Sequence, residues 1–378
     1  MAFTPLASKA SIAETTKLLA SPAEAETKQW INTKHVGLVA LFALVWSWVL
    51  QSEASQALQA VVRFDKPFFI VCFNHTITSL VLPLVFAYHW FEGRVEDRYA
   101  GLDIVAVLKR HSVIPFQKLC RISAWLSVFY LLADYFWYAA LANVSVTAGT
   151  AIFNCSPLFV YCFSICFLHE RPSFGKVCGV LTSFVGVTMV VMFQDGSDAN
   201  AIEGTSLLAG FLVVISAALY GGYEVALRLA VGEDITDTST LLTMTGLTGL
   251  FTIPLWLAGS FALAYSPFSS LYEPLGFPVT GDGVLLLLLS GMMAVVFNVF
   301  LPLSLCWTSP LETSVGVMLT IPLSGVIDTL FHHTSFSWQC IVGSALVMGG
   351  FGVLEYFNGP PERHHHDEPE PERPTMLV

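Results

Sequence analysis

The chain has 378 residues, of which 54% are hydrophobic and only 12% charged, and its formal net charge is −11. A soluble domain carries about twice this charged fraction, and after Lys176 only three basic residues follow, Arg228, Arg363 and Arg373. These features exclude an ordinary soluble domain and a nucleic-acid partner. They predict a protein that crosses a lipid bilayer several times and keeps its positive charge on one side.

Ten stretches are apolar and long enough to cross the bilayer, which takes roughly 20 residues of helix. In chain order they cover about 36–50, which can extend into the Ser, Ala and Gln residues behind it, then 67–91, 122–142, 146–168, 174–193, 206–230, 241–263, 284–305, 309–331 and 338–356. The predicted fold class is therefore an all-α integral membrane protein with ten transmembrane helices.

The segments outside these stretches predict the orientation in the membrane. Residues 1–34 are polar and are expected to form a disordered cytoplasmic N-terminus, and residues 358–378 an acidic, proline-rich, disordered tail. With the N-terminus inside, every basic residue except Arg63 and Lys66 falls in a cytoplasmic segment, as the positive-inside rule requires. We therefore expect both termini to be cytoplasmic.

The two halves of the chain resemble one another. When the chain is aligned with itself, Pro157 falls on Pro322, and Gly179 and Gly186 fall on Gly343 and Gly350. Residues 35–194 and 204–357 would then each hold five spans, and an odd number of spans turns the second copy upside down. Inverted repeats of this kind are typical of secondary transporters, whose substrate sites lie near the midplane of the bilayer.

Several motifs resemble those of a known group of membrane proteins. The stretch Phe167-Leu-His-Glu-Arg-Pro-Ser-Phe-Gly175 is similar to the junction between spans 4 and 5 of the EamA-like drug/metabolite transporter superfamily. The motifs that resemble the F branch of solute carrier family 35 are Asp65-Lys-Pro-Phe-Phe69, Thr308-Ser-Pro-Leu311, and Leu319-Thr-Ile-Pro-Leu-Ser324 with Asp328. That branch includes yeast vacuolar-membrane relatives linked to thiamine.

The resemblance implies a transporter that works by alternating access, with a thiamine-like substrate favoured. Nucleotide-sugar carriers of the same family have a lysine-bearing motif in span 9, and this chain has no lysine or arginine in that span. A nucleotide sugar therefore stays as the alternative substrate. The vacuolar relatives favour a vacuolar, lysosome-like or other endomembrane location.

Acidic residues inside the spans are the first candidates for a substrate site, because a charged side chain there is costly and should face a cavity or a partner. Glu312 begins span 9 and Asp328 lies near the other end of that span, where it could instead cap a helix. Glu224 lies between aromatic and basic neighbours, with Tyr220 and Tyr223 before it and Arg228 four residues after it. A pair between Glu224 and Arg228 is the alternative role.

Asp134 opens the run Asp-Tyr-Phe-Trp-Tyr138. A carboxylate beside aromatic faces can hold an organic cation by charge and by cation–π attraction. The same aromatic residues could instead form a belt at the membrane interface. Both interpretations stay open.

Polar side chains in spans 2, 4 and 8 form a second set of candidates, because each needs a hydrogen-bond partner inside the bilayer. These are Asn74, His75, Asn154 and Asn298. Pro157 and Pro322 should break the helices of spans 4 and 9 at corresponding places. Paired breaks of this kind point to the binding site of a transporter, although bonds between helices are the alternative role for each amide.

Three classes of function compete. A carrier of small polar or cationic metabolites is favoured, with proton coupling through Glu224 or Asp134, and a non-transporting membrane partner or trafficking protein is the alternative. Catalytic motifs such as HExxH and GxSxG are missing from the sequence, so no enzyme is expected. We expect no cofactor and no metal site, and the sequence leaves a homodimer open. Glu14, Leu18 and Leu19 have the spacing of a sorting signal read by adaptor proteins.

Overall fold

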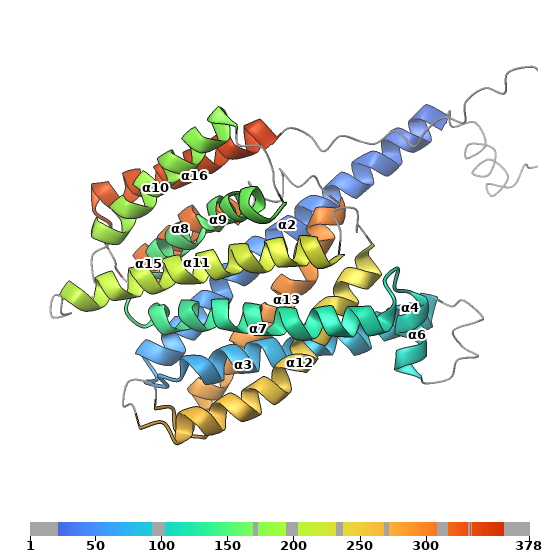
Figure 1. Cartoon of the computed structure of the whole chain (residues 1–378), viewed down its shortest axis with the longest axis horizontal. Helices are drawn as coiled ribbons and strands as arrows, with labels where there is room; N and C mark the ends of the chain where they lie inside the picture. Colours follow the sequence, from blue (N-terminus) through green and yellow to red (C-terminus); the bar gives the residue numbers. More distant parts are fainter. Residues whose placement is uncertain are drawn as a thin grey trace, which may run out of the picture.

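A computed structural model describes residues 22–92, 103–168, 173–193, 203–231, 237–267, 272–307, 317–331, 333 and 335–358. These residues are helical apart from turns and short connections (Figure 1). Glu14, Leu18, Leu19, Glu312, Thr308–Leu311 and the tail from residue 359 lie outside the described residues, and so does the side chain of Arg228. The elements in chain order are α2 (Pro22–Ala60), α3 (Pro67–Ile77), the 3₁₀ segment η1 (Thr78–Leu80), α4 (Val81–Glu92), α6 (Ile104–Arg110), α7 (Phe116–Leu141), α8 (Val146–Phe153), α9 (Ser156–Phe163), the π-helical segment η2 (Ser164–Leu168), α10 (Phe174–Phe193), α11 (Glu203–Val231), α12 (Thr238–Ala264), α13 (Gly281–Trp307), α15 (Thr320–Phe331) and α16 (Trp338–Asn358).

Eight stretches of helix in the described residues are long and apolar enough to cross a membrane. They are Val36–Ala60, Pro67–Phe91, Phe116–Leu141, Val146–Phe167, Phe174–Phe193, Leu207–Leu227, Thr238–Ala264 and Gly281–Leu301. Two shorter apolar helices, Thr320–Phe331 and Trp338–Val353, lie where the sequence predicts spans 9 and 10. The described residues therefore agree with the predicted all-α integral membrane protein, with eight helices of spanning length where the sequence predicts ten.

The first helix is longer at both ends than the sequence suggested. It begins at Pro22, inside the segment expected to be disordered, because proline suits the first helical position and the Ala and Glu residues that follow favour helix. It also continues past Leu50 to Ala60, because its polar residues there find partners on other helices. Gln51 Nε2 donates to the Tyr138 hydroxyl at 2.6 Å, and the hydroxyls of Ser55 and Ser290 lie 2.7 Å apart.

The second span is not a continuous α-helix, because α3 and α4 are joined by η1. Pro83 causes this change, since it lacks an N–H group and its ring crowds the carbonyl four residues earlier. The Thr78 hydroxyl donates to the carbonyl of His75 at 2.6 Å. On α12, a Cβ added at Gly249 would lie 2.6 Å from that same carbonyl. The lack of a side chain at Gly249 thus lets α12 pack directly against the backbone that carries His75.

The fourth span is broken as well. Its helix stops at Phe153, passes through a turn at Asn154 and Cys155, and resumes in α9 with Pro157 as the second residue. In span 9, a turn at Leu319 comes directly before α15, whose third residue is Pro322. Both interruptions therefore come shortly before the aligned prolines.

Helices α10 and α16 lie side by side along one edge of the molecule (Figure 1). They meet at glycines. A Cβ added at Gly186 would lie 2.6 Å from the Gly343 carbonyl oxygen, and one added at Gly350 would lie 2.6 Å from the Gly179 carbonyl oxygen. Such backbone-to-backbone packing depends on small residues, as is common between helices in membranes.

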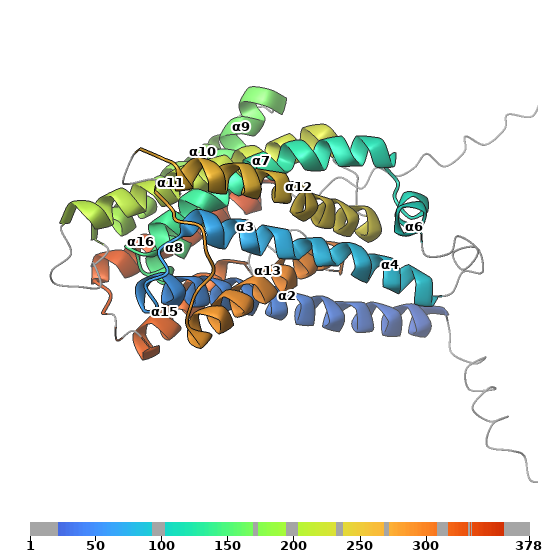
Figure 2. The same ribbon diagram turned by 90° about the horizontal axis from the view of Figure 1, so that it is seen from below.

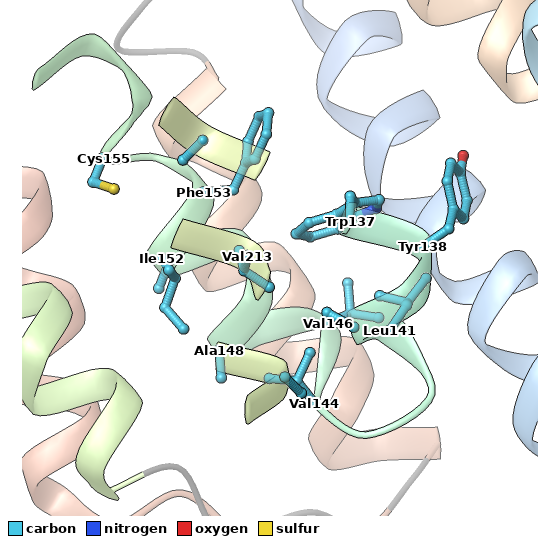
Figure 3. Packing of buried hydrophobic residues seen from close by; sticks show 14 of the residues in the cluster. Trp137, Tyr138, Leu141, Val144, Val146, Ala148, Ile152, Phe153, Cys155 and Val213 are labelled. Atoms are coloured by element: carbon cyan, nitrogen blue, oxygen red, sulfur yellow. The ribbon is translucent and has the colours of Figure 1, made fainter. Parts of the chain in front are cut away.

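The interior of the bundle contains α3, which packs between α12 and α13 (Figure 2). Next to it lies an aromatic core in which Trp137 of α7 faces Phe153 of α8, with ring centroids 5.5 Å apart (Figure 3). Trp48 of α2 packs against both rings at 5.4 and 5.2 Å. This core fixes α2, α7 and α8 relative to one another and therefore fixes the position of Asp134, one turn before Tyr138 on α7.

Candidate substrate site

The centre of the candidate site is a pair formed by His75 of α3 and Asp134 of α7. His75 Nε2 lies 2.8 Å from Asp134 Oδ2, and the two side chains are only 5% and 14% exposed. An acid and a histidine at this distance satisfy one another inside an apolar medium, which offers neither a solvent partner. The second ring nitrogen, His75 Nδ1, is buried and has no hydrogen-bond partner among the described residues.

Three tyrosines lie next to this pair. The ring centroid of Tyr130, one turn before Asp134 on α7, lies 4.4 Å from that of His75. Tyr223 of α11 stacks on Tyr130 at 5.2 Å, and Tyr220 lies 5.8 Å from Tyr223. The i, i+3 spacing of Tyr220 and Tyr223 places both on one face of α11, and that face is turned toward α7. Aromatic faces this close to a carboxylate form the arrangement that attracts organic cations.

A small cavity opens beside His75, Tyr130 and Tyr223. Its other lining residues are Thr78, Met244, Thr245, Thr248, Gly249 and Asn298. The volume open to the centre of a water molecule is about 20 Å³. This is enough for a water molecule but not for a metabolite. Asp134 is connected to this cavity through His75. The spans are therefore closed around the pair in this conformation.

Asn298 of α13 completes the polar wall of the cavity. Its side-chain carbonyl accepts a hydrogen bond from the Tyr130 hydroxyl at 3.3 Å, and its Nδ2 donates to the carbonyl of Ala294 at 2.8 Å. The amide is thus oriented by its own helix and holds Tyr130 in place. Of the predicted site residues, Tyr223 and Asn298 line the cavity, Asp134 binds a lining residue, and Tyr220 packs behind Tyr130.

Tyr138 belongs to a separate polar network next to the cavity. Its hydroxyl accepts hydrogen bonds from Gln51 Nε2 at 2.6 Å and from Asn74 Nδ2 at 2.8 Å, and Asn74 also donates to the Ser290 hydroxyl at 2.8 Å. Tyr138 is only 1% exposed. In Figure 3 its hydroxyl points away from the Trp137 and Phe153 cluster. This network joins α2, α3, α7 and α13. It lies next to the His75 and Asp134 pair, since Asn74 precedes His75 and Tyr138 follows Asp134 by one helical turn.

Asn154 and Asp328 lie elsewhere. Asn154 Nδ2 donates to the carbonyl of Thr150 at 2.8 Å within the same broken helix. Asp328 is 1% exposed and accepts hydrogen bonds from the backbone N–H and the hydroxyl of Thr147, at 2.9 and 2.6 Å. It therefore caps the start of α8 from α15, since the first N–H groups of a helix have no partners within the helix.

Glu224 is half-buried on α11 and lies close enough to Tyr220 and Tyr223 to interact with both electrostatically. Its expected alternative partner, the side chain of Arg228, falls outside the described residues. Glu224 thus extends the acidic and aromatic surface that begins at Asp134.

Within the described residues, no three His, Cys, Asp or Glu side chains come together as a metal site would require.

The structure adds residues that the sequence did not single out. Tyr130 was not among the expected site residues, although its position four residues before Asp134 places both on one helical face. His75 was noted only as a polar residue within a span, because its pairing with Asp134 joins two separate helices. Glu53 of α2 is a further acid inside a span, and it escaped notice because span 1 was expected to end near Leu50.

One acidic residue outside the spans has a defined role. Glu273, in the connection between α12 and α13, accepts hydrogen bonds from the backbone N–H groups of Phe68 and Phe69 at 2.9 and 3.2 Å. Burial raises the pKa of Glu273 above its ordinary value, although these two hydrogen bonds and the nearby Lys66 ammonium oppose the rise. Burial has the opposite effect on a cation and lowers the pKa of Lys66. The Lys66 ammonium donates a hydrogen bond to the carbonyl of Gly276 at 3.1 Å. The connection is thereby fastened to the start of α3.

Comparison with known proteins identifies the class. Residues 35–192 match the EamA-like transporter family. The chain is 26% identical over 345 residues to an uncharacterized transporter of Schizosaccharomyces pombe, covering 87% of this chain and 97% of that protein. It is 24% identical over 368 residues to an uncharacterized vacuolar membrane protein of Saccharomyces cerevisiae, covering 86% and 90%. It is also 25% identical over 334 residues to human solute carrier family 35 member F3, covering 84% and 72%.

A solved crystal structure shares the fold, with a TM-score of 0.51, 17% identity, and coverage of 86% of this chain and 98% of its own. Its apolar helices and its sequence relatives together indicate a multi-pass membrane protein similar to transporters. More particularly, residues 35–192 are similar to the EamA-like transporter family, and the chain is similar to solute carrier family 35 members F3 and F5. The resemblance predicted from its motifs is confirmed.

Proposed function

We propose that this protein is a secondary transporter that carries a small polar or cationic metabolite, with a thiamine-like cation favoured, across an endomembrane by alternating access. The observation that carries the proposal is the carboxylate of Asp134, bonded to His75 and surrounded by Tyr130, Tyr220 and Tyr223 in the interior of the bundle. A carboxylate supplies the counter-charge for a cation, and tyrosine faces add cation–π attraction. Both suit a cationic heterocycle such as thiamine.

Alternating access is supported by the closed state of the site. A space of about 20 Å³ for water-sized spheres cannot hold a metabolite, so the walls must separate before a substrate enters. Spans 4 and 9 each contain a break near the aligned prolines Pro157 and Pro322. Discontinuous helices at corresponding positions are a common feature of transporters of this kind.

Two inverted five-helix repeats, residues 35–194 and 204–357, form part of the same proposal. In the alignment of the halves, Gly179 matches Gly343 and Gly186 matches Gly350. In the fold, Gly186 meets Gly343 and Gly179 meets Gly350. A reciprocal exchange of partners is what a two-fold axis between equivalent helices requires, and this reciprocity supports the repeat.

The alternative substrate, a nucleotide sugar, has less support. The phosphate groups of a nucleotide sugar need cationic or strongly donating side chains around them. The residues that line the cavity include neither lysine nor arginine. A non-transporting membrane partner would not need an acid and a histidine paired beside a cavity. The experiment below distinguishes these alternatives.

For location, we propose a vacuolar, lysosome-like or other endomembrane with both termini in the cytoplasm. The Saccharomyces cerevisiae relative is described as a vacuolar membrane protein, and the distribution of lysine and arginine favours this orientation. In that orientation Glu14, Leu18 and Leu19 would be available to sorting adaptors. The connection held by Glu273 would then face the lumen.

The test is a binding screen followed by a flux measurement. Purified protein is heated with thiamine, thiamine phosphates, nucleotide sugars, amino acids and polyamines, because a ligand that binds the folded state raises the melting temperature by mass action. The same compounds are then supplied in labelled form to proteoliposomes. We expect thiamine or a similar cation both to stabilise the protein and to accumulate. Stabilisation by nucleotide sugars alone would favour the alternative substrate, and binding without flux would favour a non-transporting partner.

A further inference from the structure

The His75 and Asp134 pair can take up one exchangeable proton, which either residue can carry. With Nε2 of His75 at 2.8 Å from Oδ2 of Asp134, an imidazolium facing a carboxylate and an imidazole facing a carboxylic acid have the same composition. In both cases the net charge of the pair is zero. When that proton leaves, the pair carries one negative charge in a site that is almost closed to water.

His75 also occupies the place that a cationic ring would take. Its imidazole lies over the face of Tyr130 at 4.4 Å and bonds the carboxylate through Nε2. These are the two contacts, aromatic and ionic, by which such a site would bind an organic cation. His75 lines the cavity, whereas Asp134 is connected to the cavity through it. A substrate that is to reach Asp134 must therefore take over the contact that His75 now makes.

We propose that His75 is an internal competitor for the cation site, and that each substrate cation bound at Asp134 is exchanged for the proton of the pair. The inference rests on the proposed function, since it names how that same site is coupled to its driving ion. Upon binding, the proton leaves the pair for water on the side from which the substrate enters, and the neutral imidazole moves off the carboxylate. The cation then pairs with Asp134. The charge of the site is zero before and after, so the exchange is electroneutral for a monovalent cation.

The groups around the pair leave His75 and Asp134 as the carriers of this proton. The titratable side chains that interact electrostatically with Asp134 are Tyr220 and Tyr223 from α11 and Tyr130 and Tyr138 from α7 itself. Glu224 of α11 lies behind them, next to Tyr220 and Tyr223. The cavity residues from α12 and α13, Met244, Thr245, Thr248, Gly249 and Asn298, do not titrate. Tyrosines ionise near pH 10 in water, outside the physiological range. Glu224 interacts with the tyrosines and is tested separately below.

The first experiment measures thiamine binding to the purified full chain in nanodiscs between pH 5 and pH 8, with a pH-indicator dye in weak buffer. We expect wild-type protein to release about one proton per thiamine bound. Once the pair is protonated, the affinity for thiamine should fall about tenfold for each unit by which the pH decreases, because one proton competes with one cation. His75→Gln should bind thiamine with an affinity that does not change over this range and without proton release. If His75→Gln keeps the wild-type pH dependence, the inference is wrong.

His89→Gln is the matched control. His89 is also buried, at 7% exposure, but it bonds the Ser239 hydroxyl at 2.9 Å and stacks on His111 at 3.8 Å, away from the cavity. It should retain both the proton release and the pH dependence of wild type. Loss of both effects in His89→Gln would mean that a different histidine carries the proton.

A second experiment needs no substrate. The imidazole resonance of His75, assigned by its loss in His75→Gln, is titrated in ligand-free wild type and in Asp134→Asn. Removal of the facing carboxylate should change the titration of the His75 resonance, because the contact at 2.8 Å couples the two side chains. An unchanged titration would overturn the coupling between the two residues.

The two experiments separate the inference from the function on which it rests. If wild-type protein binds no thiamine at any pH, the proposed substrate is wrong, and the titration of His75 still decides whether the pair is coupled. If thiamine binds but no proton is released, the transporter proposal stands and the exchange does not.

Discussion

Asp328 on α15 accepts hydrogen bonds from both the backbone N–H and the hydroxyl of Thr147 at the start of α8, across 181 residues of sequence. A buried carboxylate with two donors on another helix fixes the relative position of spans 4 and 9. It does so at one end of the broken span 4, opposite the turn at Asn154. The contact between Asp328 and Thr147 therefore offers a direct measure of how firmly spans 4 and 9 are joined.

We expect Asp328→Ala to lower the free energy of unfolding by about 1–3 kcal/mol, because it leaves the buried N–H of Thr147 without an acceptor. Thr147→Val should cost less, and the double variant should cost less than the sum of the two single changes. The measurement is denaturation in mixed micelles. Thr329→Ala is the control, since that exposed hydroxyl bonds only Gly325 within α15, and it should have little effect. Strict additivity would show that the pair does not join the helices.

Gly343→Ala should destabilise the protein, whereas Gly349→Ala on the same helix should not. A Cβ at position 343 would lie 2.8 Å from the Gly186 carbonyl oxygen, so α10 and α16 would have to move apart. A Cβ at position 349 meets nothing within 4 Å, and alanine favours helix over glycine by up to about 1 kcal/mol. Melting temperatures in detergent compare the two. Equal effects of the two changes would contradict the close packing of α10 against α16.

Asp134→Asn and Glu224→Gln should fold and insert normally, because each amide keeps the shape of the acid and is less costly to bury. Uptake of labelled thiamine into proteoliposomes should nonetheless fall by roughly tenfold, equivalent to about 1.4 kcal/mol of lost interaction. A variant that loses its dependence on a pH gradient has lost a proton carrier, whereas one with only a higher apparent KM has lost a cation contact. If both variants transport like wild type, the site lies elsewhere, and Asn154 and Asn298 become the next candidates.

Glu273 should make stability depend on pH. Because burial raises its pKa in the folded state, the native protein binds more protons than the unfolded chain. The contribution of Glu273 to stability is therefore greatest below the ordinary glutamate pKa of about 4.3, and it declines as the pH rises through the raised value. Thermal unfolding in a pH series should show this decline in wild type and not in Glu273→Gln. Identical slopes in the two proteins would rule out Glu273 as its source.

Topology can be tested with a tag at each end. If both termini are cytoplasmic, protease added to sealed endomembrane vesicles of native orientation should cleave both tags, because the cytoplasmic face of such vesicles is outermost. A soluble protein of the lumen, the control, should be cleaved only after the membrane is permeabilised. Cleavage of one tag alone in sealed vesicles would mean an odd number of spans, and the arrangement of five plus five helices would fail.

The spans were predictable because their signal is local. A run of about 20 apolar residues specifies a membrane helix without reference to any partner, so α10 begins at Phe174 and ends at Phe193, where the sequence placed it. The longer α2 was less predictable, because Gln51 and Ser55 are tolerated in a span only when Tyr138 and Ser290 are there to bond them. Those partners lie on other helices.

The candidate site was predictable only in part for the same reason. The cost of burying an acid points to Asp134, and helical spacing groups Tyr220 with Tyr223. The sequence does not show that the partner of Asp134 is His75, 59 residues away. Nor does it show that Tyr138 bonds Gln51 and Asn74, since a buried hydroxyl beside a cavity and one within a network have the same local sequence. Tertiary packing alone distinguishes these cases.

The two kinds of glycine contact have different mechanical consequences. On α10 and α16, four glycines interlock in reciprocal pairs, so these helices resist sliding and should travel as one rigid body. Where α12 packs on the second span, only α12 contributes glycines, since Gly249 meets Thr78 and Gly246 meets Leu82. This contact lacks the reciprocal exchange of glycines that joins α10 to α16. The bundle should therefore yield along the face of α12 that covers the His75 and Asp134 pair, and the route by which the pair meets water should open on that side.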